Sequence, residues 1–162
     1  MMERIQENKI HCENASPRYV LLHTFSHLLI RSLAKMCGYQ SASLKERIYS
    51  TYPSGENMAG ILIYTASSDV EGSLGGLAAQ GKSEYLEKII DDLLDEAEWC
   101  SGDPLCMTST GINGQGLYGL NYAACHQCTL LPETSCTMRN LLLDRAALIG
   151  RTEDGTVGFF IL

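Results

Sequence analysis

The sequence predicts an α+β fold in which a small, mainly antiparallel sheet packs against two long helices. Residues 17–37 and residues 83–99 carry apolar side chains at helical spacing, which predicts the two helices. Between them lie two short apolar stretches, 48–51 and 60–65, which are separated by turn-forming residues and predict a β-hairpin. A cysteine-rich loop region follows the second helix and completes the predicted domain.

The length and charge of the chain restrict its organisation and its partners. With 162 residues, of which 45% are hydrophobic, it can form one domain with a sizeable core. We expect residues 1–15 to be an N-terminal arm or linker and residues 16–162 to be the domain. The net charge of −7 disfavours general binding to nucleic acid over the whole surface, because phosphate binding relies on lysine and arginine. Residues 1–49 hold seven basic and four acidic side chains, so a local basic face is compatible with the sequence.

The cysteine count and the hydropathy pattern bear on the compartment. Seven cysteines are an odd number, and no N-terminal stretch resembles a secretory signal, so we expect reduced thiols and a cytoplasmic protein. No run approaches about 18 consecutive apolar residues, which predicts that the chain does not span a membrane.

The first helix has clear signals at both ends. Ser16 is a favourable N-cap, and Pro17 suits the first helical position because an N–H there has no partner in the helix. Gly38 favours the end of the helix. The apolar stripe consists of Leu22, Phe25, Leu29, Leu33 and Met36. This spacing predicts a buried helix of about six turns.

Two histidines and an arginine, His23, His27 and Arg31, lie one turn apart along the polar edge of this helix. His23 and His27 have the spacing of a zinc protease helix, but Thr24 stands where the general base glutamate belongs. A hydrolase is therefore the weaker hypothesis. We favour histidines that pack beside the core and hydrogen-bond to neighbouring backbone, and contact with a partner or with nucleic acid is the alternative.

Shorter patterns fill the middle of the chain. Residues 43–46 fit a capping box and predict a short helical turn before the hairpin. The second strand is apolar on both faces, so we expect it to be central in its sheet. Residues 76–83 match the phosphate-loop pattern GxxxxGK[ST], but no strand ends at the first glycine and no later aspartate closes an apolar strand. We interpret this match as coincidence, with Ser83 as the N-cap of the second helix.

The second half of the chain combines an acidic helix with long loops. In the second helix, carboxylates lie opposite the apolar stripe, and we interpret them as a solvated surface. Residues 107–122 are a long, glycine-containing loop. In a compact domain, we expect such a loop to be functional or to be fixed in place at its two ends. Residues 138–148 predict a last amphipathic helix, and residues 156–162 predict an apolar strand.

Three closely spaced cysteines, Cys125, Cys128 and Cys136, form the strongest motif in the sequence. Thiols at this spacing suit a tight turn whose sulfurs converge, as tetrahedral zinc requires. A structural site needs a fourth ligand, and we favour Cys106, because it follows a proline in an irregular segment, over Cys100, which resembles a helix end.

Other interpretations of these thiols remain open. A redox pair is one, although such a motif usually begins a helix and would leave the third cysteine without a role. Simple buried thiols are another. His126 lies inside the knuckle and could compete as a ligand, but we expect it to point to solvent.

These motifs together resemble the MrfA-type zinc-binding domain, a module of helicase-like proteins long catalogued as a domain of unknown function. The version in the helicase-associated component of the DISARM anti-phage system is the most similar. The likeness covers roughly residues 17–150. It rests on HTFSHLLIRSL from His23, SLKERIY from Ser43, GSLGGL from Gly72, DPLC from Asp103, ACHQC from Ala124, ETSC from Glu133 and LDR from Leu143.

The resemblance implies a set of ligands and a setting. By position, Cys106, Cys125, Cys128 and Cys136 match the family's metal-site cysteines, with Cys100 as the alternative first ligand. The family's modules follow helicase or helicase-like cores, and the expected partners are a helicase-like motor domain or other defence-system subunits, and DNA. This chain has no motor motifs of its own.

We therefore expect a non-catalytic accessory domain with a structural Zn²⁺ in a four-cysteine knuckle that fixes the loop 107–122 as a rigid surface. No catalytic residue, small-molecule site or membrane contact is predicted. Two alternatives remain open: a protein–protein interaction module that docks through the acidic helix without touching DNA, and a small hydrolase that uses His23 and His27.

Overall fold

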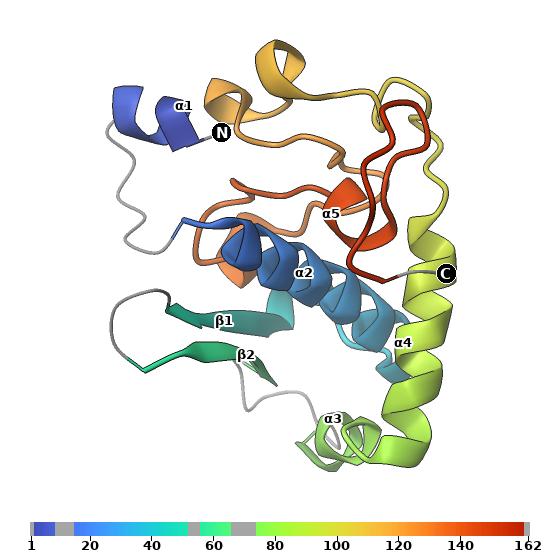
Figure 1. Ribbon diagram of the computed structural model, residues 1–162. Coiled ribbons are helices and arrows are strands. Elements are labelled where there is room, and N and C mark those ends of the chain that lie inside the picture. The colour runs from blue at the N-terminus through green and yellow to red at the C-terminus, as the bar shows by residue number, and fades with distance from the viewer. Residues whose placement is uncertain (1, 9–14, 52–55, 66–73, 161–162) are drawn as a thin grey trace.

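The computed structural model describes residues 2–8, 15–51, 56–65 and 74–160. A long central helix, α2 (Pro17–Cys37), separates a β-hairpin from the loop-rich C-terminal half of the chain, as Figure 1 shows. The hairpin strands are β1 (Leu44–Thr51) and β2 (Met58–Thr65). A second long helix, α4 (Ser83–Ala97), packs against α2. The prediction of an α+β domain with a small antiparallel sheet is confirmed.

Shorter elements connect these parts. The remaining α-helices are α1 (Met2–Glu7), α3 (Leu74–Gln80) and α5 (Ala146–Ile149), and single 3-10 turns lie at Ser41–Ser43, Gly111–Asn113, Leu117–Gly119 and Glu133–Ser135. Among the described residues, no helix is both long and apolar enough to cross a membrane.

The central helix α2 begins and ends where its sequence predicts. The Ser16 side chain accepts a hydrogen bond from the Tyr19 N–H at 3.1 Å, and Gly38 ends the helix in the left-handed region with φ of 73°. Both features satisfy backbone groups that a helix end leaves without partners. The main core lies between α2, α4 and the hairpin, and it includes Leu28, Ile30, Leu33, Leu44, Ile89, Leu93 and Leu94.

The hairpin differs from its prediction in two ways. Residues 44–46 belong to β1 and not to a helical turn, because Leu44 and Glu46 alternate inward toward α2 and both are buried. Within the described part of the chain, the sheet has two strands, paired from Leu44–Thr65 to Thr51–Met58. The strand β2 is therefore not central, and Leu62, on its outer face, is 46% exposed.

The phosphate-loop pattern falls on ordinary helical structure. Gly76 lies inside α3, and Lys82 is the residue before α4, whose first helical residue is Ser83. The predicted N-cap is thus displaced by one residue. Of the glycine-rich segment 72–77, residues 72 and 73 lie outside the described residues, and residues 74–77 belong to α3.

The N-terminal segment, which we expect to be an arm or linker, contains a short helix in its described part. Residues 2–7 form α1, whose Ile5 is 6% exposed in a small core with Tyr19, Val20, Leu120 and Leu142. The Arg4 guanidinium donates to the Gly119 carbonyl oxygen at 2.8 Å. This helix is therefore packed on the loop region of the domain.

The two predicted C-terminal elements are wrong. Arg139, Asn140 and Leu142 have φ between 50° and 65°, which breaks the helix expected over 138–148 and leaves only α5 helical. The predicted strand 156–162 reduces to one bridge between Arg151 and Thr156 in the described residues. After that bridge, the backbone N–H groups of residues 159 and 160 bond to carbonyls of α5.

Candidate metal centre

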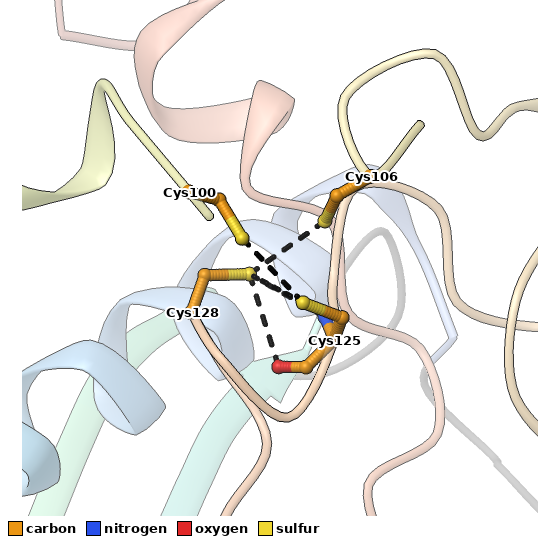
Figure 2. Close-up of side chains that lie close together, drawn as sticks. All are labelled: Cys100, Cys106, Cys125 and Cys128. Carbon is orange, nitrogen blue, oxygen red and sulfur yellow. Dashed lines mark hydrogen bonds between the residues drawn. The ribbon is translucent and has the colours of Figure 1, made fainter. Parts of the chain in front are cut away.

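Four cysteine thiols converge on one point, as Figure 2 shows. Cys100 and Cys106 come from the loop after α4, and Cys125 and Cys128 come from the CxxC knuckle. The sulfurs of Cys100 and Cys125 lie 3.5 Å apart, and Cys128 Sγ lies 3.7 Å from both Cys106 Sγ and Cys125 Sγ. A zinc tetrahedron with Zn–S bonds of about 2.3 Å has edges of about 3.8 Å, so these sulfurs fit such a site.

A carboxylate shapes the loop that carries the first two thiols. Asp103 accepts hydrogen bonds from the backbone N–H of Cys100 at 2.9 Å and of Met107 at 3.1 Å. The helix α4 ends at Ala97, so Cys100 lies beyond it in this turn. The turn folds the chain back and brings the sulfurs of Cys100 and Cys106 toward the knuckle.

A buried arginine connects that loop to α5. Arg145 is fully buried, and its Nη2 donates to both Asp103 carboxylate oxygens at 2.7 and 2.9 Å. Its Nη1 donates to the Ala97 carbonyl oxygen at 2.6 Å. The bidentate geometry fixes the loop and places a positive charge beside the sulfurs.

Hydrogen-bond donors surround the sulfurs. The Gly102 N–H points to Cys100 Sγ at 3.3 Å, and the Cys125 N–H points to Cys128 Sγ at 3.4 Å. The Thr129 hydroxyl donates to Cys128 Sγ at 3.2 Å. Such donors orient thiolate ligands and offset their negative charge.

The environment separates the proton affinities of the thiols. The Cys106 thiol, the Thr129 hydroxyl and the nearby Arg145 charge lower the pKa of Cys128 to about 4, against the opposing effect of burial. Burial raises the pKa of Cys100 to about 11, and the bond to the Cys128 sulfur raises the pKa of Cys106. At neutral pH, the Cys128 thiolate is thus ready for a cation, while Cys100 and Cys106 release their protons when the cation binds.

The structure groups the thiols in a way that differs from the predicted ligand set at one position. Cys106, Cys125 and Cys128 lie together as expected, but the fourth sulfur is that of Cys100, and Cys136 lies in a different cluster. Its resemblance to a helix end makes Cys100 only the alternative ligand in the sequence, whereas the Asp103 turn carries its sulfur back to the knuckle. Asp103, three positions after Cys100, is the sequence signal that could have indicated this turn. Metal ligation by each thiol stays a prediction.

The remaining residues of interest lie around the knuckle. His126 is exposed and outside both clusters. Arg31 holds the knuckle to α2, because its guanidinium donates to the carbonyl oxygens of Gln127 at 2.8 Å and Leu130 at 3.2 Å. The Thr24 hydroxyl, in place of a catalytic glutamate, donates to the Val20 carbonyl and accepts from a backbone N–H.

The two histidines of α2 point inward. His23 and His27 are fully buried, and His27 Nδ1 bonds to the Thr129 carbonyl oxygen at 3.1 Å. The expected position beside the core and the expected bond to backbone are present for His27. Their contacts with Glu46 and Cys136 were not anticipated, because Glu46 was assigned to a helical turn.

The fold and the thiol cluster define a class of protein, namely a small α+β module built around a closed zinc knuckle of four cysteines. The chain belongs to the MrfA Zn-binding domain family, because the sequence model of that family matches residues 25–129. It binds zinc as a member of this family, and the donor chemistry and spacing of the four thiols fit that ion. It is also 46% identical over 142 residues to the DISARM protein DrmB of Bacillus paralicheniformis. That alignment covers 88% of this chain and 24% of the relative, so the chain spans about a quarter of the relative's length.

Proposed function

We propose that this domain is a non-catalytic accessory module of a helicase-like, DNA-processing protein in anti-phage defence, in which zinc fixes a surface for DNA or for a partner subunit. The closed thiol cluster carries the proposal. Four thiolates fill the tetrahedral positions of zinc and leave none for an activated water. The relative is a DISARM protein, which supports the defence setting, and the matched share of that relative supports a role as one module among others.

The geometry supports a scaffolding role for the metal. The cluster joins the loop 100–106 to the knuckle 125–128, and so closes both ends of the segment between them. Within that segment, Gln115 and Asn121 pair as an antiparallel bridge with N···O distances of 2.5 and 2.9 Å. Loss of the metal would release the segment at both ends.

A groove beside the knuckle is the candidate contact surface. It has a volume of about 900 Å³ and lies between residues 116–118, residues 130–133 after the knuckle and residues 139–141. Exposed Leu117 and Tyr118 offer apolar and aromatic surface, and Arg139 and His126 offer groups that can contact phosphate. These are chemical features of a surface that receives a nucleic-acid strand.

A protein-interaction module is the second candidate, and the acidic face of α4 favours it. Exposed carboxylates repeat along this helix at Glu84, Glu87, Asp91, Asp92, Asp95 and Glu98. Such a face repels DNA and attracts a basic partner surface. A hydrolase that uses His23 and His27 finds less support, because both side chains are fully buried.

Removal of zinc tests the scaffolding role. Dialysis of the purified chain against a strong chelator should lower Tm and increase protease cleavage within residues 107–122, and added zinc should reverse both changes. An unchanged Tm after complete zinc removal would contradict the proposal.

Binding to a labelled single-stranded oligonucleotide at increasing salt separates the two contact modes. Direct DNA contact predicts an affinity that falls steeply with salt and falls further in Arg139→Ala, while Lys88→Ala on α4 serves as the control. Salt-insensitive binding, or none, would favour the protein-interaction module.

A further inference from the structure

A second cluster of metal-binding groups lies inside the domain, separate from the four thiols. It consists of His23 and His27 from α2, Glu46 from β1 and Cys136 from the loop after the 3-10 turn at Glu133–Ser135. One ligand atom from each residue lies within 4.8 Å of all the others. All four residues are buried, with exposed fractions between 0 and 6%.

The ligand atoms approach one another closely. His23 Nε2 lies 2.9 Å from Glu46 Oε1 and 3.1 Å from Cys136 Sγ, and His27 Nε2 lies 3.5 Å from the same carboxylate oxygen. The two imidazole rings stand nearly perpendicular, with centroids 4.6 Å apart. Histidines four positions apart on one helix face bring both Nε2 atoms to one point, and β1 supplies the carboxylate from the opposite side.

Hydrogen bonds from neighbouring residues orient several of these groups. The His27 Nδ1 atom bonds to the Thr129 carbonyl oxygen, which can only accept, so Nδ1 carries a proton. The other carboxylate oxygen of Glu46 accepts from the Ser26 hydroxyl, and Cys136 Sγ accepts from the Asn140 N–H at 3.2 Å. Outer bonds of this kind fix the tautomer and the direction of metal ligands.

Two of the inward-facing atoms lack a hydrogen-bond partner. His27 Nε2 and Glu46 Oε1 are buried without one, although they face each other. With a proton on Nδ1, the neutral His27 ring presents a lone pair at Nε2, so two acceptors oppose each other in a dry interior. A single proton on His23 Nε2 leaves His27 Nε2 unpaired. A cation at the common point gives each of the four inward-facing ligand atoms a partner, while His23 Nδ1 stays without one.

We propose that His23, His27, Glu46 and Cys136 hold a second zinc ion, which staples α2, β1 and the loop at Cys136 together. Two imidazole nitrogens, a carboxylate oxygen and a thiolate sulfur are all common zinc donors, and four donors fill a tetrahedral site. Zinc bonds of about 2.0–2.1 Å to nitrogen and oxygen give donor separations of about 3.3 Å, within a few tenths of an ångström of the distances here.

Charge balance favours the same ion. One carboxylate and one thiolate bring two negative charges, which a divalent cation cancels, so the buried site is neutral. The four protein donors leave no position open for water, and the site is therefore structural. It also explains a histidine pair with the spacing of a zinc protease in a helix that has Thr24 and no catalytic glutamate between its histidines.

Metal counting by native mass spectrometry and elemental analysis tests the proposal on the 162-residue chain. We expect two zinc ions per chain in the parent and one each in His27→Gln and Cys106→Ser. The matched controls His126→Gln, an exposed histidine, and Cys37→Ser, a thiol outside both clusters, should keep two.

X-ray absorption at the zinc edge of the parent does not depend on the folding of a variant. Two sites predict five sulfur and three nitrogen or oxygen donors shared by two ions, with shells at about 2.3 Å and about 2.0–2.1 Å. One zinc with sulfur donors alone would overturn the proposal and identify the buried groups as a protonated histidine–glutamate pair. Two zinc ions that His27→Gln retains would overturn it as well.

The same measurements separate the two metal centres. Cys106→Ser should leave one zinc with mostly nitrogen and oxygen donors, and His27→Gln should leave one zinc with sulfur donors alone. A parent with one zinc that only His27→Gln removes would uphold the second site and contradict the thiol site.

Discussion

Single residues reach across long sequence distances in this domain, and Arg145 is the clearest case. It is fully buried, and the Asp103 carboxylate balances its positive charge. Removing one partner of a buried ion pair leaves the other desolvated and unpaired. The Arg145 side chain therefore matters more to stability than any exposed charge on the domain surface.

Arg145→Met should lower the free energy of unfolding by about 3 kcal/mol, because Asp103 and the Ala97 carbonyl lose their donor. Urea denaturation measures this difference. Lys35→Met removes the exposed pair of Lys35 with Glu96 and should change the free energy of unfolding far less, because solvent screens that pair. Equal losses in the two variants would contradict the structural role of Arg145.

A second prediction for single residues concerns the thiols of the metal centre. Cys106→Ser should remove one zinc ion per chain and lower the free energy of unfolding by about 3 kcal/mol, a fraction of the roughly 10–16 kcal/mol that structural zinc contributes in small domains. Cys100→Ser should behave in the same way, since its sulfur lies 3.5 Å from that of Cys125. If Cys100→Ser kept its full zinc content, Cys100 would not be the fourth ligand.

At the scale of elements, α2 organises the molecule. Its apolar face packs on α4 and the hairpin, and its polar edge holds the knuckle through Arg31 and His27. Most helix stability in proteins comes from such packing, while caps add smaller, local contributions.

Ser16→Ala should lower the free energy of unfolding by about 1 kcal/mol, because the Tyr19 N–H loses its partner at the start of α2. Thermal or chemical unfolding followed by circular dichroism measures the change. Ser83→Ala is a suitable control, since Ser83 is exposed at the start of α4. An equal effect at both positions would show that the Ser16 cap contributes nothing specific.

Local signals predicted the elements whose causes are local. Ser16, Pro17 and Gly38 delimit α2 because caps act within one turn. The helix expected over 138–148 fails because Asn140 adopts a left-handed conformation to bond the distant Leu131 backbone at 2.7 and 3.0 Å. Sequence spacing alone could not decide whether Cys100 or Cys136 joins the CxxC pair, since both lie at a plausible number of residues from it. Only the fold decides which of the two sulfurs lies beside the pair.

At the scale of the whole molecule, stability and metal content are linked through pH. The pKa of Cys100 is raised to about 11 and that of Cys106 is raised as well, so both thiols hold protons at neutral pH in the metal-free protein. Zinc binding must displace these protons. Zinc affinity should therefore rise with pH.

Competition against a chromophoric chelator at pH 6, 7 and 8 measures this dependence. We expect the apparent affinity to increase at each step by up to about tenfold for every displaced proton. A flat profile would mean that the thiols are already ionised without metal.

The row of polar groups on α2 also has a consequence for the order in which the domain is completed during synthesis. Arg31, His27 and His23 contact groups that lie 96 to 113 positions further along the chain. A ribosome that adds roughly 5–20 residues per second therefore leaves this edge of the helix waiting for several seconds. The nascent chain can build its helix and hairpin early, but this edge of the helix can be covered only after the knuckle has been synthesised. A nascent chain stalled before residue 125 would expose the histidine edge to chaperones and proteases.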